Sequence, residues 1–176
     1  MIEKNSIPEK LTKRDLLKIL KREASRVSIG DIMDATIYLR EETKYMPARE
    51  REEFIKRFTK AFFNRMRDVK NEKDRKEYNK LVDTKRLGEF VEFLDEQLKN
   101  AKDKPEKCFQ KIARIISVYA TFIREEPIHP VGTRFPGGLM VKKRKNVYYC
   151  PVKEKQMDTP GALCRFCVSV QDPEVI

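Results

Sequence analysis

The sequence predicts a mainly α-helical protein: a five-helix bundle around an apolar central helix, followed by an irregular, metal-stapled C-terminal segment with one short β-hairpin. Residues 1–125 follow the 3.6-residue spacing of amphipathic helices, whereas residues 126–176 change to Pro, Gly, Cys and short alternating stretches. Three of the four cysteines fall in that last segment. We therefore expect a helical bundle over 1–125 and a Cys- and His-containing metal-binding segment over 126–176, packed on the bundle.

Matching start signals mark the first two helices. Thr12 is followed by Asp15, and Ser28 by Asp31. Such pairs form capping boxes, because their side chains satisfy the free backbone N–H groups at a helix N-terminus. The apolar positions that follow are Leu16, Leu17, Leu20, Ala24 and Val27 in the first helix and Ile29, Ile32, Met33 and Leu39 in the second. We expect the second helix to end before Pro47.

The third helix has the clearest single apolar face. Its members are Phe54, Ile55, Phe58, Ala61, Phe62, Met66 and Val69. A fourth helical segment runs from about residue 78 to residue 98. Asp83 and Gly88 indicate a break within it, because Asp favours helix caps and Gly weakens a helix interior.

The fifth helix differs from the others. It begins near Pro105, a residue favoured in the first helical turn, and its nine residues from Ile115 to Ile123 carry no charge. A helix that is apolar on every side belongs in the middle of a bundle, so we expect the other four helices to surround it. This stretch is much shorter than the ~20 residues of a membrane span. With no apolar signal region after Met1, we expect a soluble, cytoplasmic protein without a membrane partner.

A hairpin is predicted after the fifth helix. The runs 139–141 and 147–149 favour β-strands, and the basic stretch 142–146 between them reads as the hairpin tip. The tip holds Lys142, Lys143, Arg144 and Lys145.

Cys150, Cys164 and Cys167 predict a metal site. Structural disulfides are rare inside cells, and two cysteines separated by two residues can place both thiolates on one tetrahedral ion. Cys150 directly follows a predicted strand and offers a third sulfur. This segment has little apolar material of its own, and small structures of that kind usually need a metal or a disulfide.

The fourth ligand is contested between His129 and Cys108. His129, the only histidine, lies at the entrance to the cysteine-bearing segment and is the favoured candidate. Cys108 lies on the fifth helix, roughly 24 Å from its end. The structural alternatives are a histidine that caps the helix end and a cysteine that acts as a small buried hydrophobe. Three thiolates suit zinc, which we favour, or an iron–sulfur cluster.

The net charge of +11 permits two explanations. Residues 129–176 contain eight Lys and Arg against four Asp and Glu, and cations beside aromatic rings suit contact with RNA. The candidate RNA-binding residues are Lys142, Lys143, Arg144, Lys145, Tyr148, Tyr149, Lys153, Lys155 and Arg165. The other explanation is a Lys- and Glu-rich composition typical of hot environments, in which the basic tip is only a solvated turn.

The sequence lacks a recognisable catalytic motif. It contains no Gly-rich phosphate loop, and its single histidine has no partnered serine for a catalytic triad. We expect a zinc-stabilised, non-enzymatic protein that binds RNA or a ribonucleoprotein through its basic tail. Two alternatives remain open: an iron–sulfur redox or maturation factor for an enzyme of anaerobic metabolism, and a protein–protein adaptor.

Three stretches carry a resemblance to a known family. They are EEPIHPVGTRFPGG at 125–138, YYCPVKEKQ at 148–156 and GALCRFC at 161–167. With these motifs the chain resembles a family of uncharacterised archaeal proteins, found largely in methanogens and classed as a domain of unknown function. The resemblance implies an archaeal, anaerobic source, and it marks His129 and the three C-terminal cysteines as characteristic residues. It implies no activity, and it rests on the C-terminal third of the chain.

Overall fold

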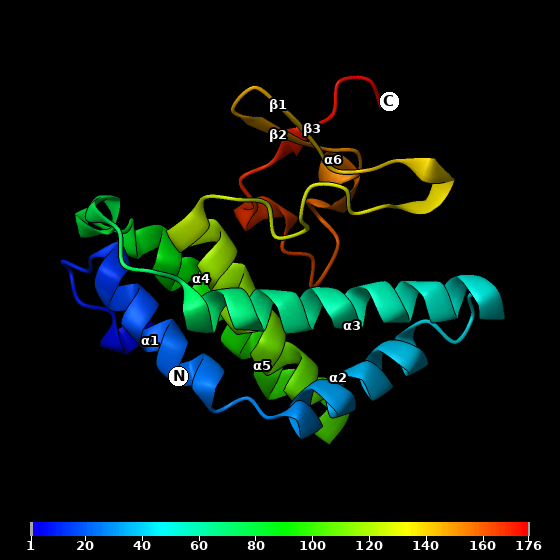
Figure 1. Cartoon of the computed structure of the whole chain (residues 1–176), viewed down its shortest axis with the longest axis horizontal. Coiled ribbons are helices and arrows are strands. Elements are labelled where there is room, and N and C mark those ends of the chain that lie inside the picture. Colours follow the sequence, from blue (N-terminus) through cyan, green and yellow to red (C-terminus); the bar gives the residue numbers. More distant parts are fainter. Residues whose placement is uncertain (1, 176) are drawn as a thin grey trace. The chain divides into compact units, whose positions relative to one another are not determined.

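Helices make up most of the chain, and a small sheet lies near its C-terminus (Figure 1). This computed structural model describes residues 2–175 and confirms the expected mainly α-helical class. The chain divides into two units, Met1–Tyr119 and Ala120–Ile176, whereas we expected the boundary at residue 125.

The first unit contains five α-helices and two short 3₁₀-helices. They are η1 (Lys4–Ser6), α1 (Lys13–Ser25), α2 (Ile29–Glu42), α3 (Ala48–Asn71), η2 (Lys76–Asn79), α4 (Thr84–Asn100) and α5 (Lys104–Val118). The predicted start signals are confirmed, because Thr12 accepts the N–H of Asp15 and Ser28 accepts that of Asp31, both at 3.1 Å. The predicted break in the fourth segment lies at Asp83, which caps α4.

Helix α5 packs against α1, α2, α3 and α4, as expected of a central helix. Every residue from Ile115 to Ile123 is buried. After Val118 the α-helix continues as a wider π-helical segment, Tyr119–Arg124, which the periodicity did not predict. This segment ends at Glu125, whose φ of 52° is the left-handed conformation that stops a helix.

Not every apolar position predicted for α2 is buried. Ile32, Ala35 and Leu39 are buried, whereas Ile29 and Met33 are 68% and 64% exposed. The buried residues are spaced by three and four, so they form one stripe, and Ile29 and Met33 fall outside it. None of the helices within residues 2–175 has both the length and the apolar character of a membrane span.

The second unit holds a three-stranded sheet in the order β1-β2-β3. Its elements are η4 (Pro136–Gly138), β1 (Lys142–Arg144), β2 (Val147–Cys150), α6 (Lys153–Gln156), η5 (Cys164–Phe166) and β3 (Val170–Gln171). Strands β1 and β2 form the predicted antiparallel hairpin, and β3 pairs parallel to β2. A third strand of only two residues is too short to leave a periodic pattern in the sequence.

The position of the hairpin turn corrects the prediction. Lys142, Lys143 and Arg144 form β1 itself, and Arg144 pairs with Val147, so only Lys145 and Asn146 remain in the turn. The run 139–141, predicted as a strand, instead closes a loop in which the N–H of Val141 donates to the carbonyl of Thr133 at 3.0 Å.

Candidate metal centre and nucleic-acid surface

Two loops of the second unit carry the three cysteines. Cys150 ends β2, and the N–H groups of Val152 and Lys153 donate to its sulfur. Cys164 begins η5, and the N–H of Cys167 closes that turn by donating to the carbonyl of Cys164 at 3.2 Å. Burial raises the pKa of the Cys150 thiol, and the two N–H donors offset only part of that rise, because they favour the thiolate that binds a metal.

Lys153 ties the two loops together. Its ammonium donates to the carbonyls of Cys164 and Cys167, at 3.0 and 2.8 Å. The residue is half-buried, and both contacts are to backbone carbonyls of its own unit. Lys153 is also one of the predicted RNA-binding residues, and these contacts give it a second role in positioning the cysteine loops.

The thiol pKa values of Cys150 and Cys164 respond to the charges of other cysteines and of Lys153. Burial raises the pKa of Cys150 and of Cys164, the charge of Cys167 raises both further, and the Lys153 ammonium lowers both. Cys150 also raises the pKa of Cys164. Within residues 2–175, however, no group of three or more His, Cys, Asp or Glu side chains is arranged to hold a metal ion. The structure therefore provides three nearby thiols and one cation rather than a formed coordination shell.

The two candidates for the fourth ligand have different surroundings. His129 is half-buried, its ring stands nearly perpendicular to that of Phe135 at 5.6 Å between centroids, and burial lowers its pKa. A lowered pKa keeps the imidazole neutral near pH 7, as a metal ligand must be. Cys108 is buried on α5, where its sulfur lies 3.5 Å from Asp31 and 3.9 Å from Asp34 of α2. Within the helical unit, the Cys108 thiol therefore acts as a hydrogen-bond donor to these carboxylates.

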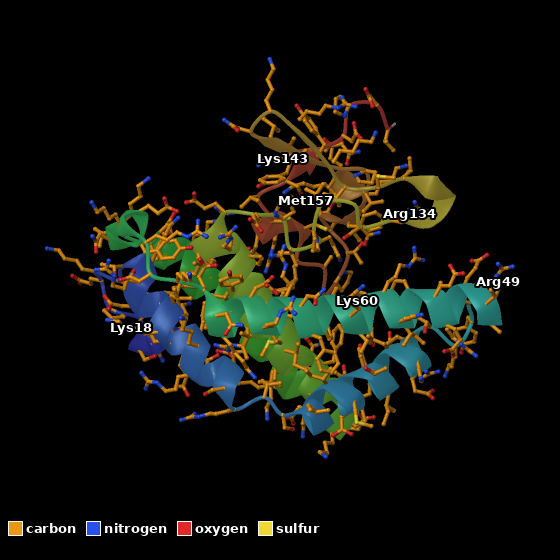
Figure 2. All side chains as sticks on the ribbon, in the orientation of Figure 1. Lys18, Arg49, Lys60, Arg134, Lys143 and Met157 are labelled. Atoms are coloured by element: carbon orange, nitrogen blue, oxygen red, sulfur yellow. The ribbon has the colours of Figure 1, made fainter. Side chains whose placement is uncertain are left out.

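The hairpin presents two different faces. Lys143 lies opposite Tyr148 in the register, so both project from one face, and the Lys143 ammonium lies 4.9 Å from the centre of the Tyr148 ring. Figure 2 labels Lys143 on this hairpin. Lys145 follows in the turn. Among the described residues, neither Lys143 nor Lys145 forms an ion pair with a carboxylate. We call Lys143, Lys145 and Tyr148 the open face.

The opposite face carries Lys142, Arg144 and Tyr149, and two carboxylates meet its cations. Lys142 lies 3.3 Å from both Asp172 and Glu174, and Arg144 also pairs with Glu174. The hydrogen bond that the Arg144 guanidinium donates to Glu174 raises the pKa of Arg144 and holds the pKa of Glu174 below its usual range. We call Lys142, Arg144 and Tyr149 the paired face.

The remaining predicted RNA-binding residues lie outside the hairpin. Lys155 is exposed on α6, and the exposed Arg165 lies over the Phe166 ring at 4.6 Å. Asp172 and Glu174, the two acidic partners of the paired face, were not predicted from the sequence. The sequence holds no local signal for them, because Pro173 and Glu174 lie in a turn after β3 and the cations that the two acids meet are about 30 residues earlier.

Comparison with known proteins identifies the family. The model of a family described as "Uncharacterized protein conserved in archaea (DUF2115)" matches residues 12–172. The chain belongs to this family. The match to DUF2115 includes the helical unit as well as the cysteine loops, so it extends well beyond the three stretches that carried the resemblance.

Relatives in methanogens support this assignment. A UPF0305 protein of Methanothermobacter thermautotrophicus is 61% identical over 165 residues, which cover 94% of this chain and 99% of the relative. UPF0305 protein MJ0646 of Methanocaldococcus jannaschii is 29% identical over 155 residues, covering 88% and 93%. No solved structure matches the chain.

Proposed function

We propose that this DUF2115 protein is a non-enzymatic RNA-binding protein whose C-terminal unit is stabilised by zinc. The observation that carries the proposal is the Lys143–Tyr148 pair on the open face, where an ammonium group lies beside an aromatic ring that is only half-buried. Single-stranded RNA is held by this combination, in which a cation contacts the phosphate and a ring stacks on the base. Lys145 adds a second exposed cation in the turn that follows β1.

The proposed zinc site is formed by Cys150, Cys164 and Cys167, with His129 as the fourth ligand. The proximity of the three thiols and the carbonyl contacts of Lys153 support it. A sheet with strands of three, four and two residues has too little packing to be stable alone. A zinc ion between the loop after β2 and the loop before β3 would hold that sheet together.

Replacing Lys143 and Lys145 with Ser tests the RNA-binding proposal. We expect the double variant to bind a labelled polyuridine strand more weakly, with a shallower dependence of affinity on salt. Each phosphate contacted on a single strand contributes about 0.7 to the slope of log affinity against log salt concentration, so loss of two contacts lowers the slope by about 1.4. Fluorescence anisotropy over a series of salt concentrations measures both quantities.

A matched control separates the open face from overall charge. Lys99→Ser with Lys102→Ser removes the same two charges from exposed positions at the end of α4, in the helical unit. This control is expected to keep the parent's slope. If the slope of log affinity against log salt concentration falls equally in both double variants, the open face has no special role. If the parent does not bind polyuridine near physiological salt, the RNA proposal is wrong.

A further inference from the structure

Acidic side chains from the segment after β3 already occupy the paired face. Lys142 and Arg144 converge on one oxygen of Glu174, and the ammonium group of Lys142 lies 3.3 Å from it. Two cations around one anionic oxygen also form the arrangement by which proteins bind a phosphate oxygen. The Tyr149 ring lies 5.6 Å from the Arg144 guanidinium. This face therefore repeats the cation–aromatic combination of the open face, with its anion site filled.

We propose that Lys142, Arg144 and Tyr149 form a second RNA-binding face, and that Glu174 competes with an RNA phosphate for it. This inference rests on the proposed function, because it names how RNA binding by the hairpin is limited. The chain thus carries its own competitor for half of the hairpin surface.

Glu174 is held weakly enough to be displaced. Its side chain is 56% exposed, and exposed ion pairs contribute little net stability because water and salt screen them. It follows a strand of only two residues and Pro173, which has no N–H to donate. Its own N–H donates to a carboxylate oxygen of Asp172 at 3.1 Å. An RNA strand that presents several phosphates in a row can therefore compete with this single carboxylate.

Asp172 has a different role from Glu174. Its side chain is 0% exposed and lies 3.3 Å from the ammonium group of Lys142. A buried carboxylate cannot leave as an exposed one can, so Asp172 keeps Lys142 directed at the paired face after Glu174 moves away. The anion site is thereby preorganised, and only its exposed occupant is exchanged.

The test is Glu174→Gln, which keeps the shape of the side chain and removes its charge. We expect the variant to bind a labelled polyuridine strand about two- to fivefold more tightly at moderate salt, the factor that corresponds to one exposed ion pair. The slope of log affinity against log salt should become steeper by about 0.7 for each phosphate gained. Anisotropy titrations of parent and variant over the same salt series measure both.

Glu154→Gln is the matched control. Glu154 lies exposed on α6 in the same unit, and among residues 2–175 it forms no ion pair with Lys142 or Arg144. It is expected to keep the parent's slope. If Glu174→Gln and Glu154→Gln gain the same affinity for polyuridine, the effect is due to net charge and the proposal that Glu174 competes with RNA is wrong. Parental binding with no gain in Glu174→Gln would also overturn it and leave the proposed function intact. If none of the three proteins binds polyuridine, the proposed function itself fails.

Discussion

Purified without oxygen, the protein is expected to contain one zinc ion per chain, and Cys164→Ser is expected to lose it. Cys164 is one of the three proposed thiolate ligands, and serine offers a poor ligand in place of a thiolate. Structural zinc contributes about 10–16 kcal/mol to the folding of small zinc-binding peptides, so its loss should unfold the small sheet of the second unit. Elemental analysis measures the zinc, and hydrogen exchange at the β2 amides measures the unfolding.

Cys108→Ser is the matched control for this substitution. It makes the same chemical change on α5, where the sulfur hydrogen-bonds to Asp31 and is not proposed as a ligand. We expect it to keep the full zinc content. A parent that holds no metal and is unaffected by chelators would eliminate the metal site. A brown protein that contains iron and sulfide would replace zinc with the iron–sulfur cluster that we kept as the alternative.

His129→Gln tests the fourth ligand separately. Loss of an outer-shell partner costs about 10–100-fold in metal affinity, and loss of a direct ligand should cost at least as much. We therefore expect this variant to release zinc to a competing chelator at a concentration that leaves the parent loaded. The same affinity in parent and variant would assign the fourth position to another group and leave His129 with its contact to Phe135.

Local signals in the sequence predicted most of the helical unit. The caps at Thr12, Ser28 and Asp83 depend on neighbours three residues away, so they can be predicted without knowledge of the fold. The uncharged stretch 115–123 predicted a central helix because no face of it tolerates water. The spacing of apolar residues did not predict the π-helical segment, because a stretch that is apolar on every side has no periodicity to distinguish a π-helix from an α-helix.

Contacts between distant residues explain what the sequence analysis missed. Glu72, at the end of α3, is buried because it accepts hydrogen bonds from the hydroxyls of Tyr78 and Tyr119. Tyr119 is 47 residues away, and no periodicity relates it to Glu72. The cysteines combine a local and a long-range signal. Their spacing predicted a cluster, but the contacts of Lys153 join residues 11 and 14 positions apart and were not predicted.

The helical unit contains a buried ion pair whose two halves should respond unequally to substitution. The side chain of Arg114, on the central helix α5, is 2% exposed, and it donates to Asp95 of α4 at 2.7 Å and to the carbonyl of Ile2. Asp95 is 25% exposed, so water can still reach it. Removing Asp95 leaves the buried charge of Arg114 without a partner, whereas removing Arg114 leaves a carboxylate that water can solvate.

We expect Asp95→Ala to lower the free energy of unfolding by about 3–5 kcal/mol and Arg114→Met to lower it by clearly less. Met fills much of the buried volume of the Arg side chain and removes a buried Nε that has no hydrogen-bond partner among the described residues. The double variant should therefore recover much of the loss caused by Asp95→Ala. Urea unfolding followed by circular dichroism gives the four free energies of this double-mutant cycle.

Glu52→Ala is the surface control for the cycle, because Glu52 also pairs with an arginine, Arg40, at 2.7 Å, but both side chains are about half exposed. Exposed pairs contribute about 0–1 kcal/mol, so this variant should stay close to the parent. If Asp95→Ala lowers the free energy of unfolding no more than Glu52→Ala does, water reaches the Arg114 guanidinium and the ion pair is not desolvated. If Arg114→Met costs as much as Asp95→Ala, the contact with the carbonyl of Ile2 contributes more than the ion pair, and the asymmetry argument is wrong.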